Sequence, residues 1–414
     1  MSILAGRRHD ARIPLAAAGI GCPEPLNDLS PEPNHAVETG PPEAEAGAVL
    51  TIDLRALVAN WRLLQARAGG AECAAVAKAD GYGLGLSAVV RALRAAGCRS
   101  FFVADLSEAV AAREACGDGT IYVLNGLLPG TAGTYAGLGL TPILGSQDEI
   151  AEWAGFCRTA GARYPAALHF DTGMNRLGLP AAAAAEVARS PLLADFEPAL
   201  VMSHFVSAEE PENPLNARQV DGFAAVRQAF PEVPASLCNS SGVFLPGRPH
   251  YDLVRPGYAL YGGNPTPGRS NPMQAVIRLQ GRIVQIRAAP DGDTVGYNAQ
   301  WTAHGARRLA VVSIGYADGY PRAASATDAK RDTQVAAGAA IVAGLHCPFA
   351  GRVSMDLIVV DITEVPAGAA KRGDLVTLIG ADLTIDEVGR RAGTIGYEIL
   401  TSLGRRYARR YVGA

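Results

Sequence analysis

The chain has 414 residues, a formal net charge of -3, 49% hydrophobic residues and 19% charged residues. This length is enough for two domains, each with its own core. The balanced charge excludes a nucleic-acid-binding surface or an anionic-membrane footprint, and no apolar run reaches the roughly 18–20 residues of a membrane span, so small-molecule chemistry is expected.

The first 47 residues differ in composition from the rest of the chain. Arg7 and Arg8 precede an apolar run over residues 13–20, as in an export signal, but charged residues interrupt the approach and no small-x-small cleavage site follows. We therefore expect a cytoplasmic protein, with export as the alternative. Residues 23–47 are rich in Pro, Glu, Asn and Ala, so we predict a disordered N-terminal extension over residues 1–47.

Structure is predicted to begin at Ala48, with a strand over 49–53 and a helix over 54–66, and a strand-then-helix rhythm follows. The candidate strands cover residues 73–78, 101–104, 120–124, 140–144, 166–171, 198–204, 235–239 and 250–255. Helical patterns lie between most of them, at residues 87–96, 107–116, 146–159 and 213–230. Short apolar strands that alternate with amphipathic helices predict a parallel sheet, and eight such units predict a (β/α)8 TIM-like barrel over residues 48–275.

After about residue 275 the pattern changes to strands without intervening helices. These strands are predicted at residues 275–287, 309–315, 353–361 and 374–379, with helices at 385–391 and 398–406. We therefore predict a mainly β C-terminal domain over residues 276–414. The fold class is α/β, a barrel followed by this second domain.

The stretch from Ala75 to Gly85 joins a strand of small residues, which carries Lys78, to a loop with three glycines. In a barrel of this kind, chemistry collects at the C-terminal ends of the strands. A lysine there loses solvation, its pKa falls, and its amine becomes the nucleophile or base that Schiff-base chemistry with a carbonyl cofactor requires. The alternative is a strand-end lysine that reaches solvent.

The loops after the seventh and eighth strands contain Ser240 and Gly257, whose hydroxyl and N–H groups are suited to a phosphate. A reactive lysine and a phosphate cradle at one barrel mouth are the two anchors of pyridoxal phosphate. Arg255 is a candidate partner for the pyridine nitrogen, or otherwise a capping or surface-pair arginine. An arginine there leaves that nitrogen unprotonated, which favours proton exchange over transamination.

Three further residues are candidates for the site. Tyr316 lies where a strand enters a glycine-rich turn and is either an acid or base, or a packed strand tyrosine. Arg176 follows the fifth strand and is either a clamp on a carboxylate or an exposed loop charge. His204 ends an apolar strand, where a satisfied core histidine is the ordinary interpretation.

From Val49 onward the chain resembles the bacterial alanine racemases, which are fold-type III pyridoxal phosphate enzymes. The resemblance rests on eight motifs in the family's order, at residues 75–85, 171–178, 203–205, 239–242, 254–262, 315–320, 351–356 and 394–398. It implies interconversion of L-alanine and D-alanine, a supply of D-alanine for peptidoglycan, and a homodimer whose active sites lie at the subunit interface.

The resemblance also implies a role for each matching residue. Lys78 would bind the cofactor covalently and act as one base, and Tyr316 from the partner subunit would act as the opposing base. Arg255 would contact the pyridine nitrogen, and His204 would link that arginine to the tyrosine. The phosphate shell would comprise Tyr82, Ser240, Gly257, Tyr258 and Tyr397, and the substrate carboxylate would meet Arg176 and the N–H of Met355.

The chain departs from the family pattern in several places. Tyr258 replaces the more usual isoleucine, and His169 replaces a lysine that is carbamylated in some members, so the negative charge beside Arg176 is missing. Asp80 replaces the more common asparagine, Leu84 replaces a common histidine, and Ser236 stands where a histidine often stacks near the cofactor. None of these changes removes a proposed proton donor.

Two rival functions remain open from the sequence. One is an amino-acid racemase of broader specificity, and the other is a non-catalytic pyridoxal phosphate carrier on the same barrel, which would end after a single domain. The seven cysteines lack the paired spacing of a zinc site or a disulfide framework, so we expect reduced thiols and no metal. An amino-acid decarboxylase or a metal-assisted aldolase would need further groups that the sequence does not show, and the absence of clustered metal ligands counts against the aldolase.

Overall fold

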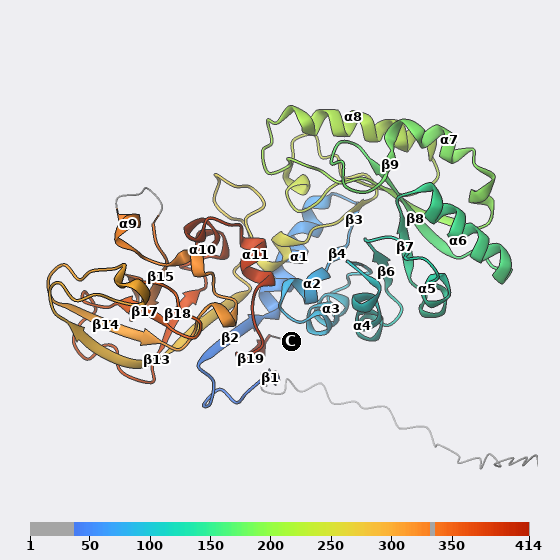
Figure 1. Cartoon of the computed structure of the whole chain (residues 1–414). Coiled ribbons are helices and arrows are strands. Elements are labelled where there is room, and N and C mark those ends of the chain that lie inside the picture. The colour runs from blue at the N-terminus through green and yellow to red at the C-terminus, as the bar shows by residue number, and fades with distance from the viewer. Residues whose placement is uncertain (1–36, 332–335, 414) are drawn as a thin grey trace, which may run out of the picture. The chain divides into compact units, whose positions relative to one another are not determined.

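The computed structural model describes residues 37–331 and 336–413. The barrel strands are β3 (Glu72–Cys73), β4 (Ala75–Val76), β5 (Ser100–Val103), β6 (Thr120–Val123), β7 (Thr141–Leu144), β8 (Pro165–Asp171), β10 (Glu197–Met202), β11 (Ala235–Ser236) and β12 (Leu253–Val254). Parallel pairing runs from β4 through β5, β6, β7, β8 and β10 to β11, and β12 pairs with β3. Figure 1 labels β3, β4, β6, β7 and β8 of this set. Hydrogen bonds from Asp252 N to Ala235 O and from Arg255 N to Cys238 O join β11 to β12 and close the ring. With β3 and β4 counted as one, the eight predicted barrel strands are confirmed.

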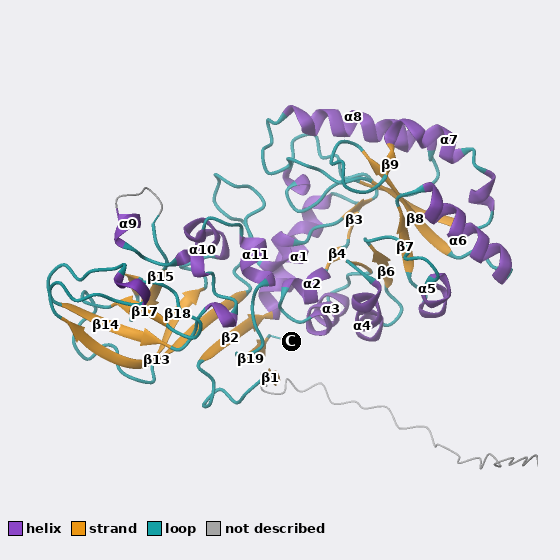
Figure 2. Ribbon diagram, in the orientation of Figure 1, coloured by secondary structure: helices purple, strands orange, loops and turns teal. Residues whose placement is uncertain are grey.

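The helices that connect these strands lie outside the ring (Figure 2). They are α1 (Leu54–Ala68), α3 (Leu86–Ala95), α4 (Leu106–Cys116), α5 (Ala132–Leu138), α6 (Gln147–Ala160), α7 (Ala184–Ala188) and α8 (Pro214–Ala229), and a short segment α2 (Lys78–Tyr82) follows β4. Side chains of Asp105 and Ser146 cap α4 and α6 by accepting backbone N–H groups. Every residue of β5 and of β7 is buried, as expected for parallel strands covered on both faces.

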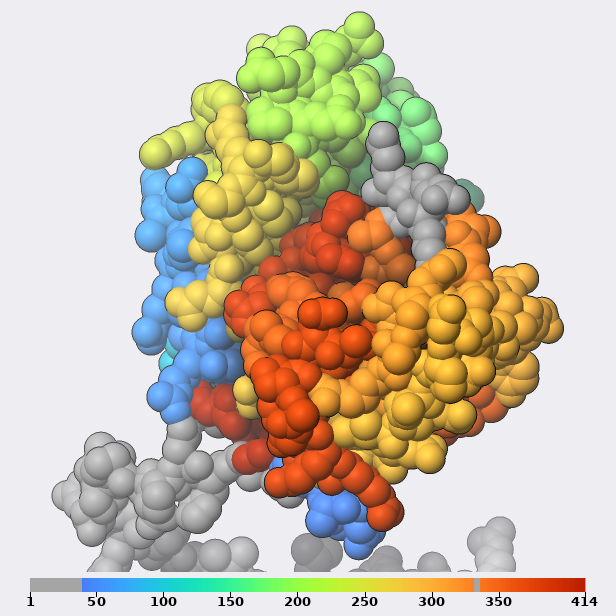
Figure 3. Space-filling view, turned by 90° about the vertical axis from the view of Figure 1, so that its left-hand side faces the viewer, coloured from blue at the N-terminus to red at the C-terminus, as the bar shows by residue number. Residues whose placement is uncertain are grey.

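The short strand β9 (Leu179–Pro180) pairs with β8, and nine further strands of the described residues form a second, mainly antiparallel sheet. They are β1 (Val37–Thr39), β2 (Ala48–Asp53), β13 (Ile277–Ala289), β14 (Arg307–Val312), β15 (Ala339–Val342), β16 (Leu345–Pro348), β17 (Ile358–Asp361), β18 (Leu375–Ile379) and β19 (Ala408–Val412). The long strand β13 pairs with β2, β14 and β18. Figure 3 views the chain from the side of these strands, where the yellow, orange and red segments form most of the visible surface.

Two features of this sheet differ from the sequence prediction. The strand β2, which precedes the barrel, pairs with β13 after it, with Ile52 opposite Ile277. The strand predicted over residues 353–361 begins only at Ile358, because Ser354 and Leu357 bond to one another and form a turn.

Residues 37–47 are ordered, in contrast to the predicted disordered extension, whose residues 1–36 lie outside the described residues. Strand β1 pairs antiparallel with the edge strand β19. The backbone oxygen of Glu43 accepts a hydrogen bond from Arg282, and its carboxylate pairs with Arg410. This edge pairing and the two arginines compensate for the low apolar content of the segment.

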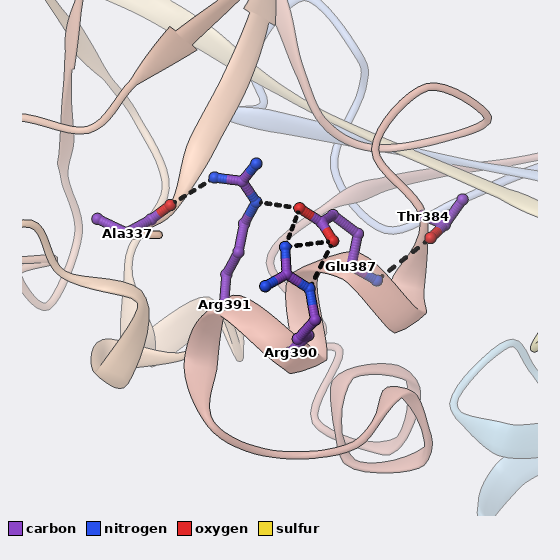
Figure 4. Close-up of polar contacts among 5 residues, drawn as sticks. All are labelled: Ala337, Thr384, Glu387, Arg390 and Arg391. Carbon is purple, nitrogen blue, oxygen red and sulfur yellow. Dashed lines mark hydrogen bonds and ion pairs between the residues drawn. The ribbon is translucent and has the colours of Figure 1, made fainter. Parts of the chain in front are cut away.

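Two short helices, α10 (Ile385–Ala392) and α11 (Gly396–Thr401), precede β19. Thr384 caps α10, and the carboxylate of Glu387 accepts hydrogen bonds from Arg390 and Arg391 (Figure 4). Arg391 also donates to the backbone oxygen of Ala337, so the helix is tied to the segment that enters β15. These contacts fix the helix pair that carries Tyr397.

Candidate active site

Lys78 lies at the barrel mouth, immediately after the first strand. The predicted strand extended to residue 78, but β4 ends at Val76 and Lys78 begins a left-handed turn. The φ angles of Ala79, Asp80, Gly81 and Tyr82 are 55°, 54°, 62° and 54°. Burial lowers the pKa of the Lys78 amine and Arg176 lowers it further, while Glu108 acts in the opposite direction. The lysine is therefore in the desolvated position that a nucleophilic amine requires.

Glu108 on α4 is a residue of this region that the sequence analysis missed. Its carboxylate accepts the N–H groups of Ala79 (2.6 Å) and Asp80 (3.3 Å) through one oxygen, and that of Ala104 (2.8 Å) through the other. The sequence pattern Asp105-x-x-Glu108 is typical of a helix N-terminus, in which the two acidic residues cap the helix. This pattern was the signal in the sequence that could have drawn attention to Glu108.

Three residues predicted for the phosphate shell lie together. The hydroxyl oxygen of Ser240 accepts hydrogen bonds from Gly257 N (3.0 Å) and Ala259 N (3.2 Å). A Cβ atom at Gly257 would lie 2.3 Å from the hydroxyl oxygen of Tyr82, so only glycine permits this approach. The Tyr82 ring stacks on Tyr261 at 4.5 Å.

Tyr258 and Tyr397 form a second pair at this mouth. Their rings stack with centroids 3.9 Å apart and an interplanar angle of 11°. The Tyr258 hydroxyl donates to Asp386 (2.7 Å), which also accepts the N–H of Asn264 (3.1 Å). Burial raises the pKa of both tyrosines, so both keep their protons. The ring of Tyr258 thus supports Tyr397, whose hydroxyl lies 3.4 Å from Glu209.

The buried Arg255 and the half-buried His204 form a polar pair under the mouth. Arg255 is 3% exposed and donates to Ser203 O (2.6 Å) and to the hydroxyl of Ser236. Its guanidinium also lies 5.8 Å from the centre of the Phe102 ring. A third contact, 3.4 Å long, reaches Nδ1 of His204, which must act as the acceptor because arginine only donates.

Burial sets the charge states of this pair. It lowers the pKa of Arg255 to about 10, so the guanidinium remains charged at neutral pH. Burial, Arg255, Arg176 and Lys78 together lower the pKa of His204 well below its ordinary value. His204 is therefore neutral, consistent with its acceptor role toward Arg255.

Arg176 is carried by a loop after β8 that Asp171 organises. The carboxylate of Asp171 accepts the N–H groups of Gly173 (2.9 Å), Met174 (2.8 Å) and Asn175 (2.9 Å). Burial lowers the pKa of nearby His169 to about 4, with Arg255 adding to the effect. His169 is therefore neutral, and it does not supply the negative charge that is missing beside Arg176.

Tyr316 and Met355 lie together in the second sheet region. Tyr316 N donates to Ser354 O and Ala317 N to Met355 O, both at 3.0 Å. The side chains of Tyr316 and Met355 are 41% and 53% exposed. In the described part of this single chain, no hydrogen bond joins Tyr316 to Lys78, Arg255 or His204, so the predicted pair of bases is not assembled within one subunit.

Within residues 37–331 and 336–413, no group of three or more His, Cys, Asp or Glu side chains is arranged to hold a metal ion. Over the same ranges, no helix is long and apolar enough to cross a membrane.

A closed barrel with a desolvated lysine at its mouth, followed by a mainly β part, is the architecture of a barrel-type pyridoxal phosphate enzyme. The chain belongs to the alanine racemase family: residues 52–265 match the model of the alanine racemase N-terminal domain, and residues 276–411 match that of the C-terminal domain. The resemblance inferred from the sequence is confirmed.

Individual relatives agree. The chain is 58% identical to the alanine racemase of Methylobacterium nodulans over 366 residues, which is 88% of this chain and 96% of the relative. It is 47% identical to the Rhodospirillum rubrum alanine racemase over 90% of this chain and 97% of the relative. The structure of alanine racemase from Bartonella henselae with covalently bound pyridoxal phosphate matches with a TM-score of 0.82 and 37% identity, covering 88% of this chain and 99% of that chain.

Proposed function

We propose that this chain interconverts L-alanine and D-alanine with pyridoxal phosphate, by a two-base mechanism. The observation that carries the proposal is the half-buried Lys78, whose amine has a pKa lowered by desolvation, at the mouth of a barrel whose opposite side holds the Ser240 and Gly257 cradle. The covalently bound pyridoxal phosphate of the Bartonella henselae relative supports the same cofactor here.

The residues at the mouth fit this cofactor. Lys78 would supply the amine for its aldehyde, and the Ser240 hydroxyl and the loop at Gly257 would hold its phosphate beside Tyr82, whose hydroxyl approaches Gly257 more closely than a Cβ atom would allow. Arg255, which is charged and only donates, suits an unprotonated pyridine nitrogen. When bound, the cofactor makes the α-proton of an attached amino acid acidic. Tyr82 and Tyr397, both protonated, are the proposed hydroxyl donors to the phosphate.

Racemisation needs a proton acceptor on one face of the substrate and a donor on the other. We assign these roles to Lys78 and to Tyr316. Because Tyr316 is exposed and has no hydrogen bond to Lys78 in one chain, we propose a homodimer in which the partner's Tyr316 completes the site. The N–H of Met355 lies next to Tyr316 and would hold the substrate carboxylate together with Arg176. Either enantiomer can then enter, since the two bases exchange roles.

The proposal extends to the cellular role and the domain division. A cytoplasmic supply of D-alanine for peptidoglycan is the proposed role, and relatives named biosynthetic (43% identical) and catabolic (45% identical) both occur in Agrobacterium fabrum. We propose a barrel domain over residues 48–275 and a mainly β domain over 276–414, with the strand β2 contributed to the second sheet.

Two variants test the assignment. Lys78→Ala is expected to lose covalent cofactor attachment and its visible absorbance, because no other amine of the mouth replaces it. Tyr316→Phe is expected to keep the cofactor and lose most racemisation, because only the second proton donor is removed. A coupled assay for D-alanine formation, with the absorbance of the same sample, measures both.

Near-normal turnover of Tyr316→Phe in both directions would refute the two-base assignment. A wild-type protein that binds the cofactor but is inactive on alanine would indicate the carrier function or another substrate. Assays with serine, lysine and arginine then distinguish a racemase of broader specificity.

A further inference from the structure

The backbone after Lys78 adopts a conformation that its residues do not favour. Ala79, Asp80 and Tyr82 are left-handed without being glycine, in an unbroken run with Gly81. Left-handed backbone is unfavourable for residues with a Cβ atom, and it persists only where the surrounding structure enforces it. The contacts that enforce this turn therefore also decide the direction in which the Lys78 side chain leaves the barrel.

The start of the turn depends on the carboxylate of Glu108. Ala79 N lies 2.6 Å and Asp80 N 3.3 Å from one of its oxygens. The other oxygen accepts Ala104 N at 2.8 Å, so the same carboxylate ties the turn to the loop after β5. Hydrogen bonds to an ionised acceptor are the stronger kind, and these reach the peptide that directly follows the lysine.

The other contacts hold the far end of the turn. Asp80 accepts the N–H of Leu86 (2.8 Å), Arg409 donates to Gly83 O (2.8 Å), and Tyr411 donates to Leu84 O (2.8 Å). In the described part of the chain, Glu108 is the only side chain that bonds the N–H of Ala79. Backbone bonds from Gly81 N to Ala77 O (2.9 Å) and from Gly83 N to Ala79 O (2.7 Å) close the turn, and Glu108 adds the side-chain contact to its first peptide.

A second carboxylate in the barrel does the same task away from the lysine. Glu149 on α6 accepts Leu127 N (2.9 Å) with one oxygen and Gly145 N (2.8 Å) with the other. Like Glu108, it lies in the first turn of its helix. It joins the loop that enters this helix to the loop after the neighbouring strand β6, as Glu108 joins the loop that enters α4 to the turn after β4. Glu149 thus provides a matched control, because it shares the geometry of Glu108 but contacts no residue of the Lys78 turn.

We propose that Glu108 is a positioning residue for Lys78, which fixes the left-handed turn and supplies the negative charge that opposes Arg176 at the amine. This inference rests on the proposed function, since it assigns Lys78 to the cofactor. The direction of the electrostatic effect agrees: Glu108 raises the pKa of Lys78, against burial and Arg176.

The test compares Glu108→Gln with Glu149→Gln in the cofactor-loaded enzyme. The glutamine keeps the size of Glu108 but places an NH2 group against one of the backbone N–H donors, and it removes the charge. We expect Glu108→Gln to lower kcat about 10- to 100-fold in both directions, the range in which a misplaced catalytic group costs activity, with little change in KM. Cofactor release is expected to accelerate, and the pH midpoint of cofactor attachment is expected to move to lower pH.

Glu149→Gln is expected to lose thermal stability without these changes. The inference is overturned if Glu108→Gln has the kcat, release rate and pH midpoint of Glu149→Gln. A wild-type chain that neither binds the cofactor nor racemises alanine would instead refute the proposed function. Glu108→Ala serves as a second variant, and its release rate and pH midpoint should change at least as far as those of Glu108→Gln.

Discussion

Arg406 connects the two loops that carry Tyr316 and Met355, and its removal is the perturbation that the structure predicts in most detail. Its Nε donates to Asp318 (2.6 Å), the last residue of the short turn that begins at Tyr316. Its Nη1 donates to Asp356 (2.9 Å), which follows Met355. Asp318 in addition accepts Gly315 N (2.9 Å), so Arg406 braces the turn from outside.

The magnitude follows from the exposure of the three side chains. Asp318 is 9% exposed, whereas Arg406 is 54% and Asp356 57% exposed. A hydrogen bond to a charged group contributes about 1.5–3 kcal/mol, but an ion pair with exposed partners contributes about 0–1 kcal/mol because solvent screens it. Discounted for the exposure of Arg406, Arg406→Met should lower the free energy of unfolding by about 1–3 kcal/mol.

The effect on turnover should exceed what this stability loss implies. With Arg406 removed, the Tyr316 turn keeps its backbone bonds to residues 354 and 355 and the bonds that Gly404 N and the Tyr407 hydroxyl donate to Asp318 O. It loses the side chain that joins the Asp318 carboxylate to Asp356 beside Met355. Misplacement of a catalytic group costs rate steeply, so we expect kcat to fall about 10-fold or more in both directions. The visible absorbance of the bound cofactor should not change, because Arg406 contacts neither Lys78 nor the Ser240 cradle.

The assay measures kcat in both directions, cofactor absorbance and denaturant unfolding for Arg406→Met and for a control, Arg158→Met. Arg158 is on α6, where it pairs with Asp195 at 2.5 Å and contacts none of the candidate site residues. The reasoning is refuted if Arg406→Met keeps the kcat of the control, or if its cofactor absorbance is altered while its kcat is not.

Two further perturbations have clear expected outcomes. Gly257→Ala places a Cβ atom 2.3 Å from the Tyr82 hydroxyl, so we expect the free energy of unfolding to fall by about 1–3 kcal/mol and the cofactor to be released faster. A release rate equal to that of the wild type would contradict this expectation. The pKa of His169 falls to about 4 in the folded chain, below its value when unfolded. Protonation of His169 therefore favours unfolding, and the free energy of unfolding should decrease by about 3 kcal/mol as the pH falls from about 6.5 to about 4. Urea unfolding at several pH values measures this decrease, and His169→Gln should lack it.

The barrel was predictable because its signals are local. Parallel strands covered on both faces give short apolar runs such as Phe101–Val103, and their alternation with helical patterns marks each unit. The position of a strand end in such a barrel also predicts that Lys78, Ser240 and Gly257 lie at one mouth. The pairing of β2 with β13 was not predictable, because periodicity identifies a strand but not a partner more than 200 residues away.

The missed parts of the site depend on contacts between distant segments. Ala79 and Tyr82 have no local preference for left-handed backbone, and the turn is held by contacts from Glu108 on α4 and from Arg409 and Tyr411 on β19. The support of Tyr397 by Tyr258 depends on Asp386 in α10, more than 120 residues away. Glu108 itself resembles an ordinary capping residue in the sequence, and only the structure connects it to the lysine.

The charged groups at the barrel mouth bear on the presence of a neutral histidine at position 169. Burial and Arg255 keep His169 neutral, and burial keeps His204 neutral, so the fixed positive charges around Lys78 are those of Arg176 and Arg255. The carboxylates of Glu108 and Asp171 oppose these charges, and a phosphate and a substrate carboxylate would add to them without any anionic residue at position 169. The orientation of Arg176 then depends on the loop that Asp171 builds through three backbone N–H groups, which requires nothing from position 169. Under the proposed function, a neutral side chain at position 169 is compatible with carboxylate binding by Arg176, because the Asp171 contacts order the loop that carries this arginine.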